Sequence, residues 1–168
     1  MPSAAVFVSV EEYLQKVYRP DCDYIDGEVV ERNVGEFDHG RLQTLISAYL
    51  VGRERLWGIT AVTELRVQVK PTRFRVPDIV VIANPLPRTR ILREPPLLCI
   101  EILSPEDRMV KVQEVVDDYL DFGVPCVWIV NPGTRRGFVC TPEGMVEAKD
   151  GVLRVAGSRI EVPLADLG

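Results

Sequence analysis

The spacing of the apolar residues changes along this chain, and these changes limit the folds that it can form. In residues 39–55 apolar side chains recur every three or four positions, including Leu42, Ile46 and Leu50, as on the buried face of a helix. Elsewhere they alternate with polar residues or form continuous runs, as strands do. The predicted elements are a helix at 39–55, strands at 65–69, 75–82 and 97–103, a helix at 104–122 and a strand at 124–130.

This order of helix, three strands, helix and strand predicts the fold class. It favours an α/β or α+β domain in which helices flank a mixed central β-sheet. Asp26-Gly27, between two apolar pairs, predicts a β-hairpin before the first long helix. Short strands between Gly and Pro turns follow residue 137. We therefore expect antiparallel strands to be added to the core at both ends.

Capping residues indicate where two helices begin. Ser9, followed by Glu12, predicts a short outer helix at residues 10–17. Ser104-Pro105 predicts in the same way that the second long helix begins there, ends at Gly123 and buries Met109 among its apolar residues.

Length and composition restrict the class of protein. The 168 residues, 46% of them hydrophobic, predict one domain over residues 1–168 with its core at about 37–132. No apolar run approaches the roughly 20 residues of a membrane span, and the first ten residues lack the features of a secretory signal. We therefore expect a cytoplasmic protein without a membrane partner. The four cysteines are too widely spaced for a Cys-x-x-Cys site and are expected to be reduced core residues.

Two carboxylates stand in apolar surroundings. Asp78 directly precedes the apolar run at residues 79–82, and Glu101 interrupts the next run, between Ile100 and Ile102. One such acid is most simply a strand-end residue that is hydrated or paired with an arginine. Two on neighbouring strands raise each other's pKa unless a cation lies between them, and oxygen ligands from two acids and water suit Mg²⁺.

These residues carry a resemblance to a known family. The motifs are Pro77-Asp78, the sequence Glu101-Ile102-Leu103-Ser104-Pro105, and residues 123–132 after the second helix. They resemble the Uma-two (Uma2) family of restriction-endonuclease-like proteins, in the PD-(D/E)XK nuclease superfamily. The similarity extends back to the hairpin and to His39-Gly40, and covers residues 9–132.

The resemblance implies a restriction-endonuclease-like core and a metal-dependent DNA endonuclease, in which a metal-activated water hydrolyses the phosphodiester bond. Asp78 and Glu101 would be catalytic residues and ligands of Mg²⁺, or of Mn²⁺ in its place. A homodimer is expected because cutting both strands requires two sites. Glu28 and His39 are candidate accessory residues. Each also fits a simpler reading, Glu28 as a solvated turn residue and His39 as a helix-entry residue bonded to backbone.

The catalytic lysine of this family is missing from its usual position. By resemblance that position lies fourteen residues after Glu101, and it is Val115 here. Lys111, one helical turn earlier, is the candidate replacement, and Arg108 is the second. Lys111 is explained equally well as a solvated side chain. The alternative function is therefore a catalytically impaired homologue that binds nucleic acid or acts in protein interactions.

The net charge of −5 seems to disfavour nucleic acid, but the charge is unevenly distributed. Residues 65–93 contain seven cations and one acid, a net charge of +6, and the remaining chain has a net charge of −11. Because this segment flanks Asp78, we expect weak, salt-sensitive DNA binding on one face. The candidate contacts to nucleic acid are Arg73, Arg75, Arg88 and Arg90.

Overall fold

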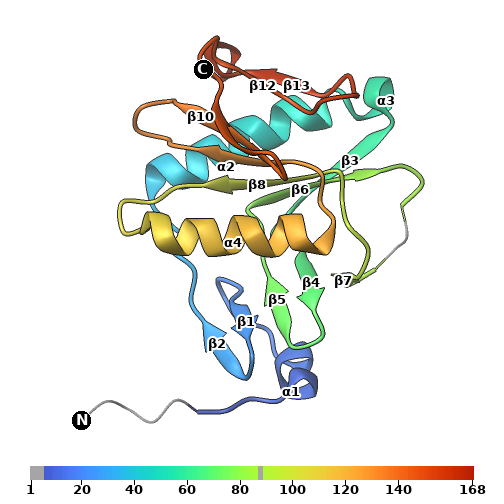
Figure 1. Ribbon diagram of the computed structural model, residues 1–168, viewed down its shortest axis with the longest axis vertical. Helices are drawn as coiled ribbons and strands as arrows, with labels where there is room; N and C mark the ends of the chain where they lie inside the picture. The colour runs from blue at the N-terminus through green and yellow to red at the C-terminus, as the bar shows by residue number, and fades with distance from the viewer. Residues whose placement is uncertain (1–5, 87–88) are drawn as a thin grey trace.

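The computed structural model describes residues 6–86 and 89–168, whose strands form three sheets (Figure 1). The largest is mixed, because β8 and β9 are parallel whereas its other neighbouring strands are antiparallel. Its order is β11-β10-β9-β8-β6-β3. The strands are β3 (Ile59–Thr63), β6 (Ile79–Ala83), β8 (Leu98–Ile102), β9 (Val127–Val130), β10 (Gly137–Thr141) and β11 (Gly144–Glu147).

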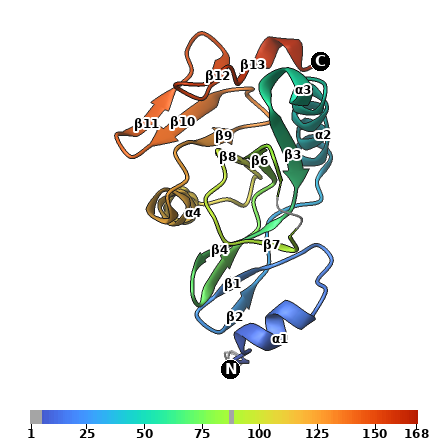
Figure 2. The ribbon, with the colours of Figure 1, turned by 90° about the vertical axis from the view of Figure 1, so that its right-hand side faces the viewer.

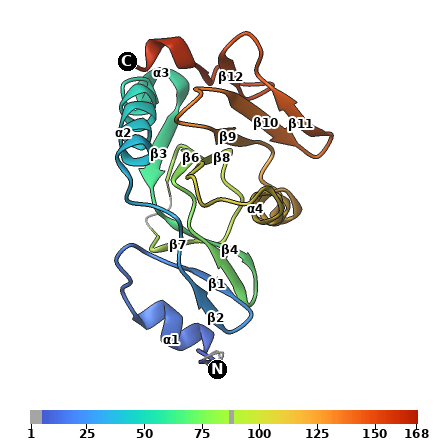
Figure 3. The ribbon, with the colours of Figure 1, turned by 90° about the vertical axis from the view of Figure 1, so that its left-hand side faces the viewer.

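Two long helices cover opposite faces of this sheet (Figures 2 and 3). On one face, Ile46 of α2 (Phe37–Val51) belongs to the same buried cluster as Ile79. On the other, Val116 of α4 (Met109–Phe122) belongs to a cluster with Val80. Consecutive strand residues point to opposite faces, so β6 contributes to both layers. The short helix α3 (Glu54–Trp57) follows α2.

A second sheet, with the order β2-β1-β5-β4-β7, lies below the first in Figure 1. The predicted hairpin joins β1 to β2, and its turn residues Asp26 and Gly27 both have positive φ. Helix α1 (Val10–Gln15) packs Tyr13 against Tyr24 and Phe74 of this sheet. The strands are β1 (Asp23–Ile25), β2 (Glu28–Val30), β4 (Arg66–Lys70), β5 (Arg73–Arg75) and β7 (Ile91–Leu92).

The C-terminal segment adds a third, two-stranded antiparallel sheet. It consists of β12 (Val152–Arg154) and β13 (Glu161–Pro163), followed by a short 3₁₀ helix (Leu164–Asp166). Leu153 and Val162 extend the core on the α2 side. The expected α+β fold, a mixed sheet between helices with antiparallel strands at both ends, is therefore confirmed. In the part of the chain that the structure describes, no helix has the length and apolar character to cross a membrane.

The predicted strand at 75–82 is wrong, because the chain changes sheets within it. β5 ends at Arg75 and belongs to the small sheet, whereas β6 begins at Ile79 and belongs to the large one. Pro77, between them, cannot donate a backbone hydrogen bond to a neighbouring strand. Asp78 therefore lies at the junction of the two sheets.

The predicted start of the second long helix at Ser104 is also wrong. Residues 104–107 form a turn in which the backbone N–H of Asp107 donates to the carbonyl of Ser104 (3.0 Å) and the Asp107 carboxylate accepts from the Ser104 N–H (2.8 Å). The helix begins five residues later, at Met109, whose side chain is 56% exposed rather than buried. The N-cap residue of the helix is Arg108, and the Ser104 hydroxyl donates to Glu106 at 3.2 Å, so Ser104 does not cap the helix.

Candidate active site

The two predicted acids lie beside each other at the junction of the sheets. β6 and β8 are antiparallel and pair Ile79 with Ile100. Asp78, one residue before Ile79, therefore lies opposite Glu101, one residue after Ile100. The backbone N–H of Ile102 donates to Oδ2 of Asp78 at 2.7 Å, which ties the carboxylate to β8. Both acids therefore lie at the same end of these two central strands.

Asp78 is deeply buried, and its charge is compensated by three donors. Besides the Ile102 N–H, its Oδ1 accepts from Nη2 of Arg32 at 2.8 Å, and its Oδ2 lies 3.2 Å from Nε2 of His39. Only 3% of its side chain is exposed. Such pairing is what makes a buried carboxylate tolerable.

Glu101 is half-buried and has fewer partners. Oε1 accepts a hydrogen bond from the Tyr119 hydroxyl of α4 at 2.7 Å. The pKa of Glu101 is raised well above its ordinary value, mainly by burial and secondly by the charge of Asp78. Burial and the charge of Glu101 raise the pKa of Tyr119 in turn. Glu101 thus has one described protein donor for its carboxylate, whereas Asp78 has three.

His39 lies in this site, at the start of α2, with 3% of the residue exposed. Burial lowers its pKa and the hydrogen bond to Asp78 raises it, with a net rise above the ordinary value. The structure thus brings together Asp78, Glu101 and His39 of the predicted set. Glu28 is an exposed residue of β2 that lines the same pocket.

The candidate replacements for the family lysine do not reach the acids. Nζ of Lys111 lies 3.4 Å from Oε2 of Glu114, and 74% of the Lys111 side chain is exposed. Lys111 and Val115 line the pocket, whereas Arg108 is an exposed residue at the start of α4 outside it. The cation that does contact Asp78 is Arg32, which follows β2.

Arg32 could not be found by sequence reasoning, because 46 positions separate it from Asp78 and no motif marks it. Tyr119 is a buried residue of α4 whose hydroxyl contacts Glu101, and no motif marks it either. No spacing rule would have found either partner.

The candidate nucleic-acid contacts lie in different environments. Arg75 is 5% exposed and forms ion pairs with Asp23 (3.0 Å) and Asp118 (2.7 Å), so its prediction as a surface contact is wrong. Arg73 is partly exposed and pairs with Asp118 and Asp26. The buried carboxylate of Asp118 on α4 holds both arginines inward. Arg90 is exposed, and Arg88 lies outside the described residues.

The family comparison agrees with this geometry. The Uma2 family, described as "Putative restriction endonuclease", matches residues 10–162. This chain belongs to the Uma2 family. A crystal structure described as "a putative nuclease belonging to DUF820 from Anabaena variabilis" aligns with 95% of this chain and 97% of that chain, at 23% identity and a TM-score of 0.79. At that identity the likeness shows the fold. A comparison with curated proteins found no match.

Two pockets of this Uma2 protein lie on either side of the Arg32–Glu64 pair. The acid pair opens into a pocket of about 510 Å³, which also contains Arg32 and the face of α4 with Val115. Acids outnumber cations around it, which favours a cation as its occupant. Its acids are Asp23, Glu28, Glu31, Asp78, Glu101, Asp107 and Glu114.

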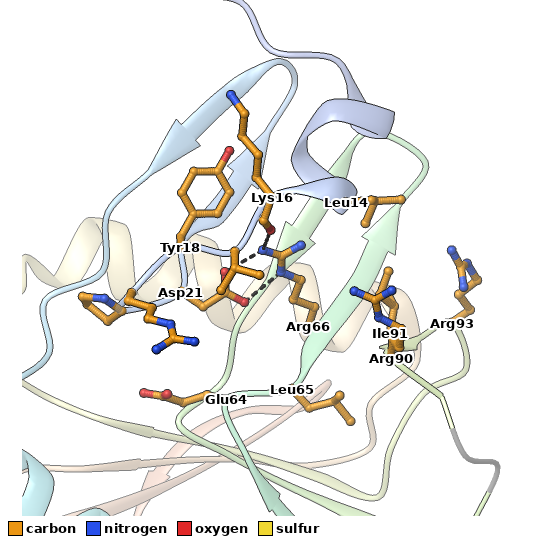
Figure 4. Close-up of a pocket in the computed structure, with 13 residues that line it drawn as sticks. Leu14, Lys16, Tyr18, Asp21, Glu64, Leu65, Arg66, Arg90, Ile91 and Arg93 are labelled. Carbon is orange, nitrogen blue, oxygen red and sulfur yellow. Dashed lines mark hydrogen bonds and ion pairs between the residues drawn. The ribbon is translucent and has the colours of Figure 1, made fainter.

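The second pocket, of about 720 Å³, is basic (Figure 4). Arg66 lies in its middle and pairs with Asp21, while Arg90 and Arg93 lie on the β7 side. Glu64 lines this pocket and lies 3.6 Å from Nη1 of Arg32, which lines the acidic one. The Arg32–Glu64 pair therefore forms a shared wall between the two pockets. The cations of the basic pocket are Lys16, Arg19, Arg66, Arg90 and Arg93.

The carboxylate oxygens of the acidic pocket suit a hard divalent cation as its ligands. Carboxylate oxygens are the ligands that Mg²⁺ prefers, and Oε1 is the oxygen of Glu101 that has a described protein donor, which leaves Oε2 for a metal. Within residues 6–86 and 89–168, no group of three or more His, Cys, Asp or Glu side chains is arranged to bind a metal ion. Water or substrate would have to supply the other ligands.

Proposed function

We propose that this protein is an endonuclease that hydrolyses phosphodiester bonds in DNA and depends on Mg²⁺ or Mn²⁺. The observation that carries the proposal is the opposition of Asp78 and Glu101 on neighbouring strands, where burial and then the charge of Asp78 raise the pKa of Glu101. Membership of a family described as restriction endonucleases supports the same reaction class.

In this proposal Asp78 and Glu101 hold the metal, and the surrounding residues fix their orientation. The Ile102 N–H and His39 hold Oδ2 of Asp78, and the Tyr119 hydroxyl holds Oε1 of Glu101. The metal would polarise the phosphate and lower the pKa of a water molecule. A carboxylate pair held in this way needs little reorganisation when the substrate binds.

The DNA backbone would approach from the basic pocket. Arg90 and Arg93 lie on its β7 side, while the acidic pocket beyond Arg32 would repel phosphate in the absence of a metal. This path replaces the one through Arg75, which is buried.

We also propose that the protein acts as a homodimer, so that two sites cut the two strands. Light scattering that gives the mass of one chain in solution would contradict the homodimer.

One observation favours a second candidate, a homologue that binds DNA without cutting it. Val115 lacks an amine, and Lys111 is paired with Glu114 rather than with the acids. This candidate predicts salt-sensitive DNA binding with no cleavage under any divalent metal.

Incubation with supercoiled plasmid tests the proposal. We expect nicked and linear products with MgCl₂ or MnCl₂ and none with EDTA. Asp78→Asn and Glu101→Gln should each abolish cleavage, whereas Glu143→Gln, at an exposed turn residue between β10 and β11, should cleave as the wild type does. Binding without cleavage would favour the second candidate. Cleavage that survives Asp78→Asn would contradict the proposed site.

A further inference from the structure

Arg32 lies where a metal would approach Asp78. Its Nη2 donates to Oδ1 of Asp78 at 2.8 Å, and the two side chains are 8% and 3% exposed. The other carboxylate oxygen of Asp78 is already bonded to His39 and to the Ile102 N–H. Oδ1 is therefore the oxygen that a metal would have to share with the guanidinium.

Residues on both sides of Arg32 contact it or its neighbour in the chain. Its Nη1 donates to the backbone carbonyl of Asp21 at 3.4 Å and lies 3.6 Å from Glu64. The next residue, Asn33, bonds Asp107 in the turn before α4 at 2.9 Å. Burial lowers the pKa of Arg32, but the charges of Asp78 and Glu101 outweigh it, so the guanidinium stays charged.

The two cations would compete electrostatically. A guanidinium and a divalent ion on the same carboxylate oxygen repel each other strongly in a site shielded from water. Glu64 offers Arg32 another partner, because it already lies 3.6 Å from Nη1 and 39% of its side chain is exposed. A small movement of the Arg32 side chain would free Oδ1 and strengthen the contact with Glu64.

We propose that Arg32 is a built-in counter-cation that competes with the metal for Asp78. It neutralises the carboxylate in the metal-free protein and moves towards Glu64 when metal binds, so that Arg32 lowers the metal affinity of the site. The inference rests on the proposed function, in which Asp78 and Glu101 are the metal ligands. The moved guanidinium lies in the wall between the two pockets, where it can bond a phosphate of the DNA that enters from the basic side.

Calorimetric titration with MnCl₂ alone, and with MgCl₂ alone, tests the inference without any need for cleavage. Arg32→Gln removes the charge but leaves an N–H donor for Asp78. We expect it to bind Mn²⁺ about tenfold more tightly or better, because the competing charge is gone. The matched control, Arg136→Gln, removes an exposed arginine that pairs with Glu147 and should leave the affinity within about twofold of wild type.

A second variant removes the alternative partner of Arg32 and should have the opposite effect on metal affinity. Glu64→Gln takes away the alternative partner of Arg32, so we expect weaker Mn²⁺ binding. Glu114→Gln, which removes an acid from the same pocket as Asp78, measures the loss that comes from general electrostatics and should weaken binding less. In the Arg32→Gln background, the extra effect of Glu64→Gln should disappear.

The outcomes separate the inference from the proposed function. Should Asp78→Asn abolish Mn²⁺ binding while Arg32→Gln binds no more tightly than wild type, the inference is wrong and the metal site stands. Should neither wild type nor Arg32→Gln bind Mn²⁺, both are wrong. If Arg32→Gln does not fold, an affinity of Glu64→Gln equal to that of Glu114→Gln overturns the inference.

Discussion

Asp118 organises the charges between α4 and the small sheet. It is 4% exposed and accepts hydrogen bonds from Arg73 (2.9 Å) and from Nε of Arg75 (2.8 Å), and Arg75 also bonds Asp23. A buried ion pair adds little net stability, but removing one member leaves the others buried and unpaired. Asp118 therefore holds α4 against the strands that lead to Asp78.

We expect Asp118→Ala to lower the free energy of unfolding by about 3–5 kcal/mol, because Arg75 would keep its burial and lose one of its two carboxylate partners, and Arg73 would lose its buried one. Urea unfolding measures the change. Asp117→Ala is the control, since Asp117 is the exposed neighbour that bonds Gln113. Equal effects of the two variants would show that the network does not stabilise the fold.

Burial also makes two cysteines unreactive. It raises the pKa of Cys126 to about 12 and that of Cys140 to about 11. All four thiols are free and buried. At pH 8 we therefore expect a thiol reagent to react slowly with the folded protein, and to react with all four thiols once the protein is unfolded in urea. The raised pKa values also contribute stability that is complete below about pH 9, the usual range of an exposed thiol, and decreases as the pH rises towards 11. Rapid reaction of the native protein would show that these residues are accessible.

Asp78 and Glu101 could be found from the sequence because each is an acid next to apolar strand residues. Their partners could not, because Arg32 and Tyr119 lie 46 and 18 positions away and contact them only after folding. Lys111 shows the limit of helical spacing. The spacing placed Lys111 near Val115 correctly, but the Lys111 amine is exposed and lies beside Glu114 rather than beside the two acids.

At the scale of elements, the apolar spacing predicted every strand of the central β6, β8 and β9 group, because buried strands need long apolar runs. It did not predict the change of sheet at Pro77, since apolar residues continue on both sides of the break. The turn at residues 104–107 was missed because it imitates a helix start: the Asp107 carboxylate bonds the Ser104 N–H as in a capping box, but the helix begins only at Met109.

Two glycines in or beside the long helices should respond to alanine with opposite signs. Gly40 lies inside α2, and a Cβ there would meet no atom within 4 Å, so Gly40→Ala should stabilise the protein by about 0.5–1 kcal/mol. Gly123 ends α4 with a φ of +110°, and a Cβ there would lie 3.1 Å from Cγ of Pro95. Gly123→Ala should therefore destabilise it by about 1–2 kcal/mol. Thermal unfolding of both variants checks the prediction, which a shift of the same sign in both would contradict.

At the scale of the whole molecule, the charge is separated into an acidic and a basic pocket that meet at one wall. A chain with a net charge of −5 can therefore still offer a local site for a phosphate backbone. The segment around residues 65–93 was expected to be basic, but the fold uses Arg66, Arg73 and Arg75 in ion pairs and adds Lys16 and Arg19 from the N-terminal part.

Binding of a labelled DNA duplex in EDTA, followed by fluorescence anisotropy, tests this separation. Arg90→Ala combined with Arg93→Ala should weaken binding and reduce the salt dependence, by about 0.9 in the log–log slope for each phosphate that the variant no longer neutralises. The control combines Arg136→Ala with Arg154→Ala, two exposed arginines paired with Glu147 and Asp150. Equal weakening in both double variants would mean that the basic pocket has no special role.

The central claim is that Asp78 and Glu101 together form a metal site. Anomalous diffraction from a crystal soaked in MnCl₂ tests it most directly. We predict one strong peak within bonding distance of carboxylate oxygens of both Asp78 and Glu101, with the Arg32 guanidinium displaced towards Glu64. A well-ordered soaked crystal with no peak between the two carboxylates, or with its peak elsewhere in the protein, would contradict the account.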